Sequence, residues 1–220
     1  MREPLTWQWL GLCTYDDALS RQERAWETCR NDGSEVCFAL EHPATITLGR
    51  RGTREDVRVA ATDLRARGIV CRDTERGGRA TYHAPGQLVL YPIAHLARRG
   101  WSVARFVTLL EDVMADIAAV VGVPTHRDAR GRGIWTRNGK LGSVGIRIRD
   151  GVSTHGLALN VDVDLSGFDL IAPCGMTDVH MTSLRAEGAS ANVLDLVPVA
   201  ERALHERFDP IAEPACEVSL

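Results

Sequence analysis

The stretch IWTRNGKLGSVGIRIRDGVSTHGLALNVDV, residues 134–163, is rich in strand-forming residues. Its strand-forming residues surround two tight-turn dipeptides, NG at 138–139 and DG at 150–151, which are typical of β-hairpins. If the DG pair supplies the two central residues of its turn, Arg149 pairs with Val152. The stretch therefore predicts an antiparallel meander with a defined register.

That register also decides which residues face each other further along the hairpin. It places Ser143 opposite Ala158, Val144 opposite Leu157 and Gly145 opposite Gly156. Paired glycines weaken a strand interior, and close approach of a ligand or of another backbone is one reason to place them there. We hypothesise that the glycine pair forms a bare strip of the sheet that admits a narrow chain.

The flanking segments supply further helices and strands. Helices are expected at 16–33, near 62–68, at 102–122 with Ser102 as its cap, and in the tail to 208, entered near Pro198; strands are expected at 35–42, 45–49, 68–71 and 88–93. This mixture predicts an α/β (α+β) fold with a mixed, largely antiparallel sheet and packed helices. No repeat, linker or charge block marks a boundary, so residues 1–220 are expected to form a single domain.

The composition of the 220-residue chain excludes some classes of protein. Its formal net charge of −3 shows no basic excess of the kind that nucleic-acid binding requires. The first residues, MREPLTWQWLGL, lack the long apolar core and the cleavage site of a secretory signal, and no apolar run reaches the roughly 18 residues of a membrane span. We therefore expect a cytoplasmic protein with no nucleic-acid or membrane partner.

The chain has six cysteines, none of them in a CxxC pair. Thiols stay reduced in the cytoplasm, so neither disulfides nor a structural zinc site is expected. Cys29, Cys37 and Cys71 lie in helix-like or strand-like stretches, and we expect them to pack as small hydrophobic residues. Cys174 differs, because it stands between a proline and a glycine, in the kind of turn on which a scaffold commonly presents a reactive group.

A second informative stretch is RGGRATYHAPGQLVLYP, residues 76–92. It lacks the GxGxxG pattern of a dinucleotide site and the GKS or GKT of a P-loop. Gly77 and Gly78 permit positive φ, and the PG dipeptide at 85–86 predicts a second turn. Residues 81–83 would lie between the turns as a short, rigid loop that walls a pocket.

This stretch resembles the signature of the lipoyl(octanoyl) transferases, the octanoyl-carrier-protein:protein octanoyltransferases of lipoate biosynthesis. EHPATITLGR, NGKLGSVGIR, THGLALNV and PCGMTDVHMTSL resemble the same family in the same order, so the resemblance spans roughly residues 41–184. The chain departs from the pattern at Ala84, where the family usually has glycine.

The resemblance implies the fold of the catalytic modules of lipoate and biotin protein ligases. It implies transfer of an octanoyl group from acyl carrier protein to a lysine amine on the lipoyl domains of 2-oxoacid dehydrogenase E2 subunits and on the glycine cleavage H protein. Cys174 would carry the acyl group, with Lys140 as its catalytic partner and with no cofactor or metal. The substrate-binding residues that it implies are Arg76, Gly77, Gly78, Arg79, Ala80, Thr81, Tyr82, His83, Ser143, Val144, Gly145, Gly156, Leu157 and Ala158.

A cysteine suits this chemistry, because thiolate attack on a thioester is nearly balanced in energy and the enzyme thioester remains reactive toward an amine. An ordinary thiol, with a pKa near 8.5, is only a few per cent thiolate at neutral pH. Two roles for Lys140 are open: its ammonium could favour the thiolate, or a neutral lysine could act as base. Backbone N–H groups near Cys174 and in the Gly77-Gly78 loop are candidates to stabilise the anionic intermediate.

Three other functions compete with this interpretation. An ATP-dependent lipoate or biotin protein ligase would need no cysteine nucleophile, and a non-catalytic acyl-binding protein would keep the pocket without turnover. A metal-dependent hydrolase would need a ligand spacing such as HExxH, which His83 and His155 lack, so we expect both to pack and hydrogen-bond, with His83 lining the substrate site. Arg76 and Arg79 could also be solvated loop charges, or could steer an acidic carrier protein.

Overall fold

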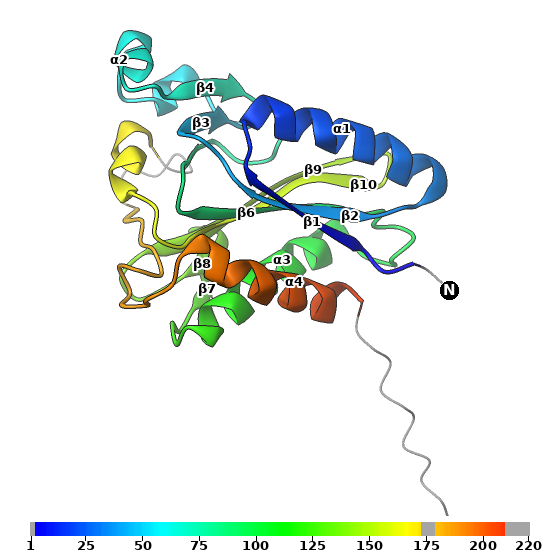
Figure 1. Ribbon diagram of the computed structural model, residues 1–220. Coiled ribbons are helices and arrows are strands. Elements are labelled where there is room, and N and C mark those ends of the chain that lie inside the picture. Colours follow the sequence, from blue (N-terminus) through cyan, green and yellow to red (C-terminus); the bar gives the residue numbers. More distant parts are fainter. Residues whose placement is uncertain (1–2, 173–178, 210–220) are drawn as a thin grey trace, which may run out of the picture.

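The computed structural model of the protein describes residues 3–172 and 179–209 (Figure 1). Within these residues the strands form a seven-stranded and a three-stranded sheet. The larger sheet has the order β1 (Thr6–Leu12), β2 (Val36–Glu41), β6 (Gln87–Ile93), β10 (Val152–Asn160), β9 (Lys140–Arg149), β8 (Gly131–Trp135) and β7 (His126–Asp128). The smaller sheet has the order β4 (Val70–Asp73), β3 (Thr45–Leu48) and β5 (Ala80–His83). Only the β1–β2 and β3–β4 pairs among them are parallel, which confirms the expected mixed, largely antiparallel sheet.

Helices cover both faces of the larger sheet (Figure 1). One face carries α1 (Tyr15–Asp32), and the other carries α3 (Val103–Val120) and α4 (Val193–Phe208). The short helices are α2 (Ala61–Ala66), η1 (Arg54–Asp56) and η2 (Leu165–Leu170). Because side chains alternate along a strand, Leu88 and Leu90 of β6 pack in the core with α3 and α4, whereas Val89 and Tyr91 pack with α1.

The predicted apolar stripe explains why α3 forms and where it packs. Phe106, Leu110, Val113 and other stripe residues are completely buried. Ser102 caps the helix, and its side chain accepts a hydrogen bond from the Arg105 backbone N–H. The predicted cap and stripe are therefore both present.

The β9–β10 hairpin has the predicted register. Val152 faces Arg149, and Gly156 faces Gly145. Asp150 and Gly151 have φ of 51° and 79°, as the two central residues of this type of hairpin turn require. A Cβ at Gly156 would lie only 2.1 Å from the backbone oxygen of Leu90, so close approach of another backbone accounts for this glycine.

Four local expectations were wrong. Residues 80–83 form strand β5, paired with β3, rather than a loop. Helix α4 begins five residues before Pro198, because Asn192 caps it by accepting a hydrogen bond from the Asp195 backbone N–H. Strand β1 was not expected at all. Cys29 and Cys37 are buried as expected, but Cys71 is only partly buried, and its sulfur accepts a hydrogen bond from Arg54.

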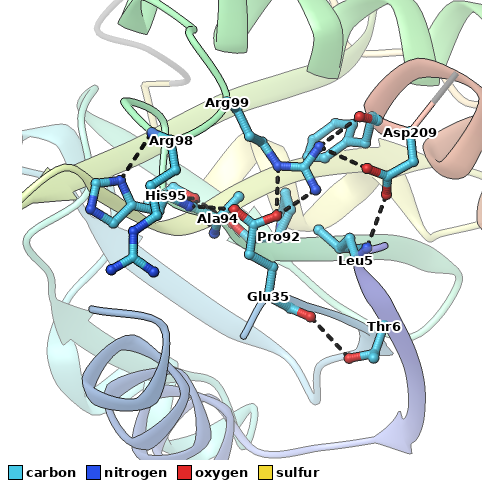
Figure 2. Close-up of polar contacts among 11 residues, drawn as sticks. Leu5, Thr6, Glu35, Pro92, Ala94, His95, Arg98, Arg99 and Asp209 are labelled. Atoms are coloured by element: carbon cyan, nitrogen blue, oxygen red, sulfur yellow. Dashed lines mark hydrogen bonds and ion pairs between the residues drawn. The ribbon is translucent and has the colours of Figure 1, made fainter. Parts of the chain in front are cut away.

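A buried ionic cluster joins the N-terminal strand to the end of α4, as Figure 2 shows. Arg99 Nε donates to Glu35 Oε2 at 2.6 Å, and Arg99 Nη1 donates to the Phe208 carbonyl at 2.6 Å. Asp209 lies 3.2 Å from the same Nη1 and accepts the Leu5 backbone N–H at 2.9 Å. The Arg99 side chain is completely buried, so these partners must compensate for the loss of water around its charge.

No helix among residues 3–172 and 179–209 has the length and apolar character needed to cross a membrane.

Candidate active site

A cavity of about 310 Å³ lies where the predicted substrate segments meet. Its walls come from β9 and β10 of the larger sheet, from segment 76–83 and from the β7–β8 hairpin. This volume is at the lower end of the range of roughly 300–1,000 Å³ that is usual for small-molecule sites. A pocket of this size suits a slender substrate rather than a bulky one.

Lys140 and almost all of the expected substrate residues line this cavity. Tyr82 does not, because it points to the other face of β5 and packs its ring against Phe168, with ring centroids 5.5 Å apart. Cys174 lies outside the described residues. Ala84 is buried and does not have positive φ, so the backbone conformation at this position does not require glycine.

Arg76 folds back onto its own loop. Its Nη2 donates to the Thr47 carbonyl at 2.6 Å and to the Arg79 carbonyl at 2.8 Å, and its Nη1 donates to the Gly77 carbonyl at 3.0 Å. The side chain is therefore not a solvated loop charge. It ties the loop that contains Gly77 and Gly78, called the glycine loop below, to β3. Gly78, with φ of 92°, supplies the left-handed residue of this loop.

Arg79 is also engaged. It forms a two-pronged ion pair with Asp56, with Nη2 2.7 Å and Nε 3.1 Å from Oδ1. The Asp56 carbonyl accepts the Ala172 backbone N–H at 2.8 Å, so the chain just before Cys174 is attached to the same wall. The loop lacks one expected oxyanion donor, because the Gly77 N–H already donates to the Ile146 carbonyl at 2.8 Å.

Lys140 is the first residue of β9, and its side chain is only 1% exposed. Its nitrogen lies 5.3 Å from the centroid of the Trp135 ring. Its backbone N–H donates to the His180 carbonyl at 2.8 Å, and its carbonyl accepts the Thr182 N–H at 3.0 Å. The chain that follows Cys174 is therefore bonded to the backbone on both sides of the lysine side chain.

Three buried imidazoles lie near one another, and two of them, His83 and His155, line the cavity. Burial lowers the pKa of His42 to about 4. Burial and the nearby Arg76 lower the pKa of His155 to about 3, and burial together with His42 brings the pKa of His83 well below its usual value. These rings are neutral at pH 7, and His83 Nδ1 lies 2.7 Å from the amide oxygen of Gln87. The expected packing and hydrogen-bonding role of His83 fits this geometry.

The sequence interpretation missed several residues that line the cavity. They are Tyr15, Arg51, Tyr91, Val107, Arg130, Gly131, Arg132 and Ile146. Ile146 could have been found, because alternation places it on the same face of β9 as Val144. The β7–β8 hairpin turns at Ala129 and Arg130, and the glycines of RGRG, residues 130–133, lie in strand β8.

Comparisons with known proteins show the family and the fold of the chain. Residues 14–205 match the lipoyl protein ligase A/B catalytic domain. An octanoyltransferase of Chloroflexus aurantiacus is 44% identical over 218 residues, which are 97% of this chain and 97% of the relative. The chain belongs to the lipoyl protein ligase A/B catalytic domain family. An octanoyltransferase of Desulfotalea psychrophila is 47% identical over 185 residues, with 82% of this chain and 83% of the relative covered.

Its similarity to several curated octanoyltransferases shows an acyl-transferring enzyme of protein lipoylation. Solved structures show the fold. A candidate lipoate protein ligase from T. acidophilum with bound lipoic acid superposes with a TM-score of 0.71 at 13% identity, covering 93% of this chain and 86% of that one. A biotin protein ligase from Aquifex aeolicus gives a TM-score of 0.51 at 10% identity, covering 92% and 68%. The expected ligase-like fold is therefore confirmed.

Proposed function

We propose that the enzyme transfers an octanoyl group from the thioester of acyl carrier protein to a lysine amine, through a thioester on Cys174. The acceptors are the lipoyl domains of 2-oxoacid dehydrogenase E2 subunits and the glycine cleavage H protein. The observation that carries the proposal is the cavity that gathers Lys140 with the glycine loop and the β9–β10 strip. Reduced Cys174 is needed, so we propose the cytoplasm as the compartment.

The reaction consists of two acyl transfers. The Cys174 thiolate attacks the thioester carbonyl of the donor, and the carrier thiol leaves. The lysine amine of the lipoyl domain then attacks the enzyme thioester, loses a proton, and expels the Cys174 thiolate. Lys140 serves the first step by ion pairing or as a neutral base and then gives its proton to the departing carrier thiolate. The neutral lysine can therefore accept the proton that the amine loses in the second step.

Both roles of Lys140 require its nitrogen to lie beside the Cys174 sulfur. The described residues that flank residues 173–178 support this. Ala172 is bonded to Asp56, whose side chain holds the glycine loop through Arg79, and His180 is bonded to Lys140. The described residue before this stretch, Ala172, is thus bonded at one wall of the cavity, and a described residue after it, His180, is bonded to the lysine.

Mass spectrometry tests the proposal. Purified enzyme mixed with octanoyl carrier protein is expected to gain a hydroxylamine-labile octanoyl group on the Cys174 peptide, and addition of a lipoyl domain is expected to discharge it. Cys174→Ala should gain no adduct, and Lys140→Ala should gain it much more slowly. Transfer that requires ATP and free octanoate, with no adduct from the carrier-bound form, would show a ligase mechanism instead.

A further inference from the structure

Glu187 lies in the turn that follows the strand-like segment 180–182, outside the cavity lining. Its Oε1 accepts hydrogen bonds from Thr182 Oγ1 at 2.6 Å and from Thr136 Oγ1 at 2.9 Å. Its Oε2 accepts from Asn138 Nδ2 at 2.9 Å. One carboxylate therefore joins the 136–139 turn to residue 182.

These partners are the segments that hold the backbone of Lys140. The Thr136 N–H donates to the Gly139 carbonyl at 2.8 Å, which closes the turn immediately before the lysine. The Thr182 N–H donates to the Lys140 carbonyl at 3.0 Å. Glu187 thus bonds to side chains of the turn that precedes Lys140 and to a side chain of the segment that is hydrogen-bonded to Lys140.

The turn also packs closely against the segment that the carboxylate fixes. A Cβ at Gly139 would lie 2.5 Å from the His180 backbone oxygen, so the two backbones approach too closely for a side chain at this position. Both threonine partners of Glu187 are buried, at 5% and 3% exposure. The two threonine partners therefore lie largely away from solvent, whereas the third partner, Asn138, is exposed.

The charge of Glu187 strengthens these bonds. Burial alone would raise the pKa of its carboxyl, but the hydrogen bonds from Thr182, Thr136 and Asn138, with the nearby Arg137, outweigh burial and hold the pKa below its ordinary value. The carboxylate is ionised at neutral pH. Hydrogen bonds to an ionised acceptor are shorter and stronger than those between neutral groups.

We propose that Glu187 is a positioning residue for acyl transfer. It fixes the 136–139 turn, immediately before Lys140, against residues 180–182, which follow Cys174 in the chain. The inference rests on the proposed role of Lys140. A shift of the turn moves the lysine nitrogen and the neighbouring chain relative to each other. Displacements of about 1 Å far from the chemistry can slow a reaction about 100-fold.

The test measures single-turnover acylation of Cys174 by octanoyl carrier protein, followed by mass spectrometry over a range of donor concentrations. Glu187→Ala is expected to slow the saturated rate about 10- to 100-fold. The donor concentration for half-maximal rate should stay unchanged, because Glu187 does not line the cavity. In a Lys140→Ala background the same substitution should have little further effect, because residues that act through one group are not additive.

A matched control is Glu27→Ala, which removes an exposed carboxylate from α1 and should leave the rate unchanged. Urea midpoints establish that each variant is folded at the assay temperature. Glu187→Gln keeps one oxygen for the two threonines and should lose less rate than Glu187→Ala. If Glu187→Ala does not fold, the effect of Glu187→Gln on the acylation rate is measured instead, once with Lys140 present and once in the Lys140→Ala background.

Three outcomes overturn the positioning role while leaving the role of Lys140 intact. The first is an unchanged rate in the Glu187 variants, and the second is an equal loss of rate with and without Lys140. The third is a raised half-maximal donor concentration with an unchanged saturated rate. A wild-type rate for Lys140→Ala alone is a different failure, because it removes the lysine from the mechanism and this inference with it.

Discussion

The glycine pair of the hairpin offers a sharp prediction, because its two members have different surroundings. A Cβ added at Gly156 would lie 2.1 Å from the Leu90 oxygen, whereas ordinary contact begins at 3.4 Å, so the atoms must separate by 1.3 Å. Leu90 belongs to β6, which pairs with β10 in the middle of the larger sheet. A Cβ at Gly145 needs only 0.3 Å more room from its nearest neighbour, the Gly77 oxygen at 3.1 Å.

We therefore expect Gly156→Ala to destabilise the fold far more than Gly145→Ala. Overpacking costs about 1–3 kcal/mol, and the disturbed β6–β10 hydrogen bonds add about 1 kcal/mol each. A loss of about 3 kcal/mol is expected at 156, against less than about 1 kcal/mol at 145, where the neighbouring loop can give way. Because that loop lines the cavity, Gly145→Ala should instead change donor affinity.

Urea unfolding of both variants, fitted with a shared slope, gives the two differences in the free energy of unfolding. The donor dependence of Cys174 acylation gives the second readout. A free energy of unfolding for Gly156→Ala within about 0.5 kcal/mol of wild type would contradict the close contact with Leu90, since scatter among surface substitutions is of that size. A larger loss of stability in Gly145→Ala than in Gly156→Ala would contradict it as well.

Three further predictions concern stability. Because the folded pKa of His42, about 4, lies below the unfolded value near 6.5, the unfolded state binds more protons below pH 6.5 and the free energy of unfolding falls as the pH drops. Between pH 7 and 5, His42 should lower the free energy of unfolding by about 2 kcal/mol. Urea titrations should show no such decrease from this residue in His42→Gln, whereas His126→Gln, a change at an exposed histidine, should keep it. Glu35→Gln removes the main charge partner of buried Arg99 and should lower the free energy of unfolding by about 3 kcal/mol; a change below about 1 kcal/mol would contradict the assigned pairing. Ser102→Ala removes the α3 cap and should cost about 1 kcal/mol in the same assay, whereas wild-type stability would show that the cap is dispensable.

Local chemistry explains which parts of the fold could be predicted. The DG turn allows only a narrow set of backbone angles, so two residues determined the pairing of a whole hairpin. Helix α3 could equally be predicted from the sequence, because its cap and apolar stripe lie within one segment. Strand β5 was not, since its partner β3 lies 35 residues earlier, counting from Thr45 to Ala80, and its glycine flanks resemble those of a loop.

In the candidate site, too, some residues could be predicted from the sequence, whereas others are brought in only by the tertiary fold. Resemblance identified residues on both walls of the cavity, but it did not reveal that one of them, Tyr82, faces the opposite side of its strand. Arg130 and Arg132 were missed because the β7–β8 hairpin reaches the cavity only through the tertiary fold. The contacts of Glu187 are likewise invisible in sequence, because its partners are up to 51 residues away.

The two walls of the cavity are held by separate sets of interactions, which has a consequence for catalysis. The glycine loop depends on Arg76 and on the Arg79–Asp56 pair. The lysine depends on the backbone bonds of Lys140 and on the carboxylate of Glu187. Disturbing the first set at Arg76 moves a wall that we propose to contact substrate, and so should act mainly on donor affinity. Disturbing the second moves the proposed reacting groups relative to each other, and so should act mainly on the saturated rate.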